Sequence, residues 1–221
     1  ESASHRTRQS LDRMLARRER QIARAIADLD AASATSVEAL LRVLNLHDPD
    51  GHGHATRVAA LSVDLARCLD VGAAALGPIR QASLLHDIGK VAIGEAVLRK
   101  PAALDGGEFD MVRQHPERGY EVLRHVPFLA EAAAIVRAHH EHFDGRGYAR
   151  GLAGDDIPLG ARIVALADSY DALTHDRPYR RAAGAEAAMH EICRCSGRQF
   201  DPAVVDAFVH LRGAGRPAVC A

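Results

Sequence analysis

The chain has 221 residues and a formal net charge of −1. This length suits one large domain with an appended segment, and the near-neutral charge excludes the basic excess of proteins that bind a nucleic-acid backbone. No stretch is long and apolar enough to predict a membrane-spanning helix, and no apolar core follows the arginine-rich N-terminus, as a signal peptide requires. We therefore expect a cytoplasmic protein that binds no DNA and does not span a membrane.

The first predicted element is an amphipathic helix over residues 8–31, within an N-terminal linker that we place at residues 1–35. Its apolar residues follow the alternating spacing of three and four that is typical of a coiled-coil seam. Its excess of arginines is interpreted as a solvated helix surface. We expect this helix to join an upstream receiver or sensor module to the domain at residues 36–221, and to support a homodimer.

From residue 36 onward the apolar residues keep helical spacing, and no alternating run predicts a strand, so the expected fold class is all-α. Asp105 and Glu108 are spaced as a capping box, and Asp201 before Pro202 predicts another helix start. A glycine-rich irregular stretch at 143–159 follows a histidine pair, which indicates a functional loop. Helices are expected near residues 36–46, 54–70, 73–87, 106–125, 128–142, 160–174, 182–194 and 202–212.

The chain contains thirteen histidines, and the sharpest local motif places His86 beside Asp87. Adjacent side chains on a helix project about 100° apart, so this pair can hold one metal ion or reach toward two. Further histidines and one aspartate stand in motifs before and after it. Five imidazoles and two carboxylates exceed the needs of one tetrahedral ion and suit two octahedral ions, with iron or manganese favoured by the absence of thiolates. The candidate ligands are His54, His86, Asp87, His115, His139, His140 and Asp168.

The ordered motifs resemble the HD-GYP family of cyclic di-GMP phosphodiesterases, a branch of the HD metallohydrolases. The resemblance runs from about Asp48 to Phe208 and is carried by His54, HDIGK, HPERG, HHEHFDGRGYARGL, IPLGARIVALADSYDAL and DRPYRRA. It implies an all-helical HD domain that hydrolyses cyclic di-GMP to linear pGpG or GMP in bacterial second-messenger signalling. It also implies two or three divalent metal ions.

The resemblance assigns metal ligation to the seven candidate ligands and gives Asp87 the role of bridging two ions. It assigns catalysis to Asp87 and Lys90, and contacts with substrate phosphates to Lys90, Arg177 and Arg180. Guanidinium groups suit this task because they hold phosphate oxygens bidentately. Substrate is also expected to approach the loop residues Gly145, Gly147 and Tyr148, since glycine permits close backbone approach.

Two positions depart from the family pattern. Ala149 replaces the proline that ends the GYP motif, and Arg180 stands where the family usually has lysine. Proline rigidifies a loop, so its loss predicts a looser loop without loss of a ligand, and the change Ala149→Pro is expected to raise activity modestly. Arg180 keeps the positive charge.

Several assignments stay open at this point. Asp50 lies where three-metal members carry an acidic ligand, but it could instead cap the helix near His54. Asp171 is an alternative to Asp168 as a ligand, and Glu141 could orient an imidazole or serve as a structural carboxylate. The alternative functions are an HD hydrolase of another nucleotide, or a weakly active or non-catalytic signalling module.

Overall fold

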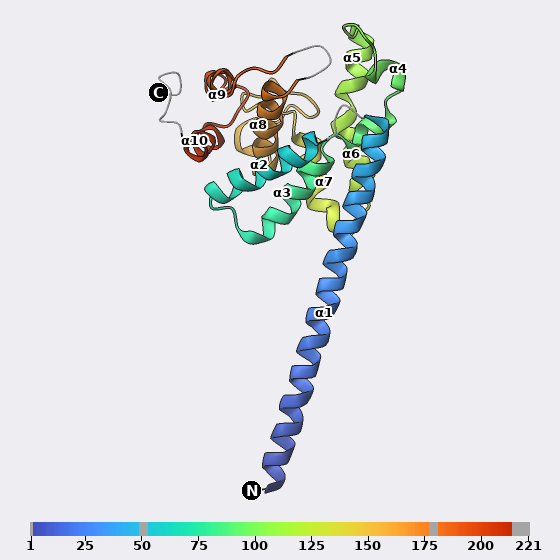
Figure 1. The fold of residues 1–221 in the computed structure, drawn as a ribbon, viewed down its shortest axis with the longest axis vertical. Helices are drawn as coiled ribbons and strands as arrows, with labels where there is room; N and C mark the ends of the chain where they lie inside the picture. Colours follow the sequence, from blue (N-terminus) through green and yellow to red (C-terminus); the bar gives the residue numbers. More distant parts are fainter. Residues whose placement is uncertain (1, 49–52, 177–180, 214–221) are drawn as a thin grey trace. The chain divides into compact units, whose positions relative to one another are not determined.

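The protein is described by a computed structural model that covers residues 2–48, 53–176 and 181–213 (Figure 1). Within these ranges the chain forms helices and no β-strand, which confirms the all-α fold class. The chain divides into two compact units, Glu1–Ala39 and Leu40–Ala221. No helix of the described ranges is both long and apolar enough to cross a membrane.

Helix α1 (Ser2–His47) is continuous, whereas the sequence predicted a helix over 8–31 and a second one over 36–46. The expected break fell on small hydroxylated residues, which often compete with helical hydrogen bonds. Here Thr35 and Ser36 instead donate their hydroxyl hydrogens to the carbonyl oxygens of Ala31 and Ala32, each at 2.9 Å. The helix therefore accommodates both residues without ending.

The second unit contains the remaining helices, and most lie within a few residues of the predicted spans. The predicted helix over 106–125 is divided at Gln114, and the short elements α4, η2 and η4 were not predicted. The elements are α2 (His54–Cys68), α3 (Ala73–Leu85), η2 (Ile88–Ala92), α4 (Glu95–Leu98), α5 (Gly106–Arg113), α6 (His115–Leu123), η3 (Pro127–Leu129), α7 (Ala130–Ala138), η4 (Gly154–Asp156), α8 (Leu159–Thr174), α9 (Ala185–Arg194) and α10 (Pro202–Leu211).

Two predicted helix starts are confirmed. The backbone N–H of Glu108 donates to Asp105 at 2.9 Å, and Glu108 accepts from the backbone N–H of Asp105 at 2.9 Å, which completes the capping box. Asp201 accepts from the backbone N–H of Ala203 at 2.8 Å at the start of α10. These bonds satisfy amides that helix starts leave free.

The core of the second unit lies among packed helices. Helix α2 contacts α3 and α8, and α6 contacts α7 and η2. Leu65, Leu85 and Phe208 are fully buried between them. The approach of η2 to α6 depends on Gly89, because a Cβ atom there would lie 2.0 Å from the carbonyl oxygen of His115. This close packing brings Asp87, just before η2, next to His115 at the start of α6.

Candidate metal centre

Six of the seven candidate ligands form two groups whose donor atoms lie within 4.8 Å of one another inside each group. The first group, here the His54 cluster, consists of His54, His86 and Asp168. The second group, here the His115 cluster, consists of His115, His139 and His140. Residues from α2, α3 and α8 meet in the first cluster, while α6 and the end of α7 supply the second.

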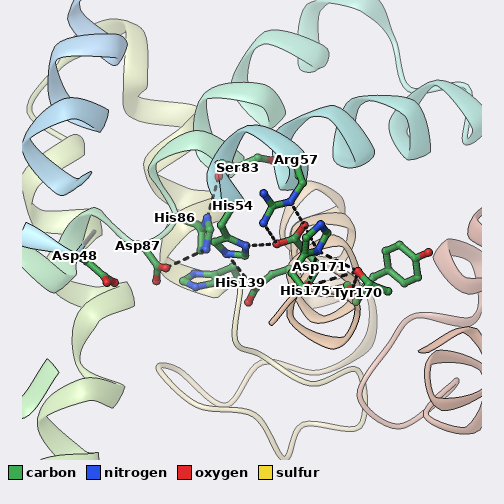
Figure 2. A network of polar contacts seen from close by, with 12 residues as sticks. Asp48, His54, Arg57, Ser83, His86, Asp87, His139, Tyr170, Asp171 and His175 are labelled. Atoms are coloured by element: carbon green, nitrogen blue, oxygen red, sulfur yellow. Dashed lines mark hydrogen bonds and ion pairs between the residues drawn. The ribbon is translucent and has the colours of Figure 1, made fainter. Parts of the chain in front are cut away.

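The seventh candidate, Asp87, lies between the two clusters. Its Oδ2 atom is 3.3 Å from Nε2 of His86, and its Oδ1 atom is 3.4 Å from Nε2 of His115. One carboxylate therefore presents one oxygen to each cluster, and Figure 2 shows its contact with His86. This is the placement expected of a carboxylate shared by two neighbouring ions.

Three of the histidines are held by the same backbone contact. The Nδ1 atom of each ring hydrogen-bonds the carbonyl oxygen three residues earlier: His86 to Ser83 at 2.8 Å, His115 to Val112 at 2.7 Å and His139 to Val136 at 2.6 Å. A carbonyl can only accept, so Nδ1 carries the hydrogen in the neutral ring and Nε2 keeps its lone pair. Each of these rings, when neutral, thus turns a lone pair toward the centre. Burial would lower the pKa of His86, but Asp87 outweighs burial and raises it, so an ion binding there displaces a proton.

The Nε2 atoms have no protein donor to satisfy them. Nε2 of His115 and Nε2 of His139 lie 3.3 Å apart, although the bonds at Nδ1 make both atoms acceptors. Nε2 of His86 is buried, and no donor within the described residues hydrogen-bonds to it. Because buried polar atoms are rarely left without a partner, these unmatched lone pairs fit a cation held between them.

Burial keeps the His115 cluster uncharged. It lowers the pKa of His139 well below its ordinary value, with the neighbouring imidazoles adding to the effect. It lowers the pKa of His140 to about 4 and also lowers that of His115. All three rings are therefore neutral near pH 7, the form in which imidazole binds a metal.

The His54 cluster has the opposite balance. Burial alone would lower the pKa of His54, but its contacts with Asp168 and Asp171 outweigh burial and raise the pKa to about 9. Burial would raise the pKa of Asp168, but His54 and the nearby imidazoles lower it below its ordinary value. An ion entering this cluster must therefore displace a proton from His54, whose Nε2 lies 3.2 Å from Asp168.

Asp171 lies behind His54 and outside both clusters. Its Oδ2 atom accepts from Nδ1 of His54 at 2.6 Å, and Arg57 holds both of its oxygens, from Nε at 2.6 Å and from Nη2 at 2.9 Å (Figure 2). Asp168, in contrast, faces Nε2 of the same ring. The structure thus gives Asp171 the position of an outer hydrogen-bond partner of His54. Arg57 is a positioning residue that was not predicted from the sequence. Arg57 follows His54 by three residues on α2, a spacing that places both on one helix face.

Asp171→Asn is expected to reduce metal affinity at the His54 cluster by about 10- to 100-fold, because an amide cannot pair with both His54 and Arg57 as the carboxylate does. Metal titration followed by elemental analysis measures the loss, and circular dichroism checks that helix content is kept. Asp64→Asn, at an exposed ion pair with Arg67 on the same helix, is the matched control. Equal metal affinity in the Asp171 and Asp64 variants would contradict this role.

Lys90 lies against the shared carboxylate. Its Nζ atom is 2.8 Å from Oδ2 of Asp87 and 3.4 Å from Oδ2 of Asp48. Burial would lower the pKa of Lys90, but the two carboxylates outweigh burial and raise it above its ordinary value. The ammonium is therefore charged near pH 7, and it fixes one oxygen of Asp87.

The loop after the histidine pair folds back over the His115 cluster. The ring of Tyr148 stacks on His140, with centroids 4.7 Å apart and an interplanar angle of 24°. Glu141 accepts from the backbone N–H groups of Arg150 and Gly151 at 2.6 and 3.1 Å, so it orders this loop. No imidazole of the described residues hydrogen-bonds to it. A Cβ at Gly147 would lie 2.2 Å from the backbone nitrogen of His142, and this contact alone accounts for glycine at that position.

Ala149 has a φ of 105°, a region that residues with a side chain rarely adopt. Proline fixes φ near −65°, so the expectation that Ala149→Pro orders the loop and raises activity is wrong for this backbone. We therefore expect Ala149→Pro to lower both turnover and the melting temperature. The free energy of unfolding should fall by more than about 1 kcal/mol. Ala149→Gly, which tolerates positive φ, should keep both. Turnover assays and thermal melts of the two variants decide between these outcomes, and a gain of activity in the proline variant would contradict the backbone argument.

Three predicted site residues, Asp50, Arg177 and Arg180, lie outside the described residues. Gly145 lies in the described loop with a φ of 78°. The ligand set, the phosphate contacts and the loop contacts with substrate therefore stay predictions about function, although the seven candidate ligands that the structure describes lie together.

The domain is all-α, and its helix ends bring an adjacent His-Asp pair together with further histidines. This combination is typical of the class of helical HD proteins. The family profile described as an HD domain matches residues 38–204, and the chain belongs to this family. The predicted resemblance is thereby confirmed at the level of the family.

Comparison with known proteins places the chain near cyclic dinucleotide phosphodiesterases. It is 39% identical over 178 residues to a cyclic di-GMP phosphodiesterase of Thermotoga maritima, covering 78% of this chain and 48% of that protein. It is 36% identical over 181 residues to the 3′3′-cGAMP-specific phosphodiesterase 2 of Vibrio cholerae, covering 81% of this chain and 35% of that protein. The chain thus spans less than half the length of either relative.

The fold also matches solved structures. A crystal structure of a cyclic GMP-AMP-specific phosphodiesterase of V. cholerae superimposes with a TM-score of 0.61 at 21% identity, over 83% of this chain and 49% of that one. This similarity supports the helical HD fold.

Proposed function

We propose that this chain is a metal-dependent phosphodiesterase that hydrolyses a cyclic dinucleotide, with cyclic di-GMP as the first substrate to test. The observation that carries the proposal is the position of Asp87, which presents one oxygen to each of two clusters of histidine and aspartate. The family membership and the activity named for the Thermotoga relative support it.

In this proposal the His54 cluster and the His115 cluster each hold a divalent ion, and Asp87 contacts both. Divalent ions bound there would supply Lewis-acid charge to phosphoryl oxygens and make water a nucleophile near neutral pH. The donor set of imidazole and carboxylate, without thiolate, favours iron or manganese. A third ion with Asp50 as ligand remains part of the proposal, and metal-to-protein ratios of wild type and Asp50→Ala distinguish two ions from three.

The protein groups proposed to act on substrate are cations and loop residues around this centre. Lys90 is charged and lies beside Asp87, where its ammonium can neutralise a phosphate oxygen. Arg177 and Arg180 are proposed to hold the phosphates from the segment after α8. Gly145, Gly147 and Tyr148 are proposed to border the bound nucleotide, since the ring of Tyr148 covers His140.

The proposal is tested by combining elemental analysis with a turnover assay. Protein purified without oxygen and reconstituted with iron or manganese is incubated with cyclic di-GMP, and the products are separated into pGpG and GMP. We expect at least two ions per chain and hydrolysis that stops when a chelator removes them. Absence of bound metal after reconstitution, or turnover that is insensitive to its removal, would reject the proposal.

A second candidate substrate is 3′3′-cGAMP, which the relative from V. cholerae favours. The same assay with a panel of cyclic dinucleotides ranks the substrates by kcat/KM. A non-catalytic signalling module, the remaining alternative, predicts nucleotide binding without any product.

We also propose that the domain belongs to a longer signalling protein. The chain spans 48% of the Thermotoga relative, which leaves room for an upstream receiver or sensor module in a longer protein. We propose that α1 transmits its state and that a homodimer forms through this helix, in the cytoplasm. Analytical ultracentrifugation of the full chain and of a variant with charged residues on the seam tests the dimer.

A further inference from the structure

Arg113 is a cation at the border of the His115 cluster that forms no ion pair with a carboxylate of the described residues. It is the last residue of α5 and precedes His115 by two positions. Its side chain is exposed, and no carboxylate within the described ranges forms an ion pair with it. Lys90, in contrast, contacts both Asp87 and Asp48. Arg113 is therefore free to meet an incoming polar group.

The guanidinium of Arg113 is nevertheless oriented. Its central carbon lies 4.8 Å from the centroid of the Tyr148 ring and 5.5 Å from that of Phe109. Two aromatic contacts restrict the side chain, and no acceptor within the described residues pairs with the N–H groups at the edge of the guanidinium plane. Arg137 differs from Arg113, because it lies over the Tyr120 ring and also holds both oxygens of Glu117.

The position of Arg113 relative to the centre indicates which part of a nucleotide it meets. Tyr148 stacks on His140 and Arg113 lies over Tyr148, so one aromatic ring separates the guanidinium from the nearest candidate ligand. The scissile phosphate must reach the two clusters, which places a more distant part of the same nucleotide at Arg113. The exposed ring of Phe109 beside Arg113 suits a purine base better than a second phosphate, because bases stack on aromatic rings.

We infer that Arg113 reads the base of the bound cyclic dinucleotide and selects guanine over adenine. This inference rests on the proposed function. Arginine donates two parallel hydrogen bonds to O6 and N7 of guanine, whereas adenine presents an amino donor in place of O6. Glutamine pairs in the same bidentate manner with the N6 and N7 atoms of adenine. The residue at position 113 thus sets the preference between the two purines.

The test compares cyclic di-GMP with cyclic di-AMP, which share the phosphate ring and differ in the base. Equilibrium affinity and kcat/KM are measured for both with the metal-loaded full chain, for wild type, Arg113→Gln and Arg113→Lys. Arg113→Gln should lower the preference for cyclic di-GMP over cyclic di-AMP, measured as the ratio of their kcat/KM values, on the order of 10- to 100-fold. Arg113→Lys, which keeps the charge but loses the fork, should lose most of the preference. Arg118→Gln, at an exposed residue of α6, should match wild type.

Each outcome has a definite reading. Equal losses for both dinucleotides would place a phosphate at Arg113 and overturn base reading, and an unchanged ratio in Arg113→Gln would overturn it as well. Binding of both dinucleotides without product would reject the proposed hydrolysis. The ratio of the two affinities would still test whether Arg113 reads the base. Failure of wild type to bind either dinucleotide would overturn both proposals.

Discussion

Hydrolysis is expected to fall by about three orders of magnitude or more in Asp87→Asn, because the amide cannot present an anionic oxygen to each cluster. Bound metal should fall at the same time, since the substitution removes the contact shared by His86 and His115. The fold should persist because helices outside the centre bury most of the apolar surface. Turnover and elemental analysis of the same preparation measure both effects.

The matched control for Asp87→Asn is Asp110→Asn, which changes an exposed aspartate on α5 that belongs to neither cluster. The control should keep the turnover and metal content of wild type. Turnover near the wild-type value in Asp87→Asn would reject the metallohydrolase proposal, whatever the metal content.

Gly89→Ala should destabilise the protein by about 3 kcal/mol, near the upper end of overpacking costs. The added Cβ would lie 2.0 Å from the carbonyl oxygen of His115 and 2.6 Å from the backbone nitrogen of Gly119, and neither backbone atom can rotate away. Helix α6 and η2 must then separate, which moves Asp87 from His115. For a domain of this size the melting temperature should fall by about 6–12 °C.

Gly77→Ala is the matched control for this change. Gly77 lies inside α3, and nothing lies within 4 Å of the position that an added Cβ atom would occupy, so alanine should stabilise the helix by about 0.5–1 kcal/mol. The two substitutions therefore have opposite signs. Equal melting temperatures for Gly89→Ala and wild type would show that η2 and α6 do not need this close contact.

The fold class was predictable because helical spacing of apolar residues persists along the chain and several helix starts carry their own caps. Two helix boundaries were not predictable from the sequence. The spacing across residues 106–125 is continuous, yet the chain breaks at Gln114, where His115 donates back to Val112 and Pro116 follows. The expected break before residue 36 is absent because Thr35 and Ser36 bond within α1.

The candidate site was predictable in composition and less so in arrangement. Local motifs identified the residues that carry imidazoles and carboxylates. The histidines and Asp87 lie near helix ends, whereas Asp168 lies within α8. The separation into two clusters depends on how five helices that are distant in the sequence pack together, which no short motif encodes. Arg57 was missed for the same reason: its partner Asp171 is more than one hundred residues away, and only the fold joins them.

The repeated contact between a histidine and the carbonyl three residues earlier couples ion occupancy to local backbone order. His86, His115 and His139 each follow the last turn of a helix and satisfy a carbonyl that the helix end leaves free. Binding that restricts the motion of these three rings therefore also stabilises the backbone at the ends of α3, α5 and α7. Amide hydrogen exchange at these three helix ends would therefore follow the filling of the site even when no substrate is turned over.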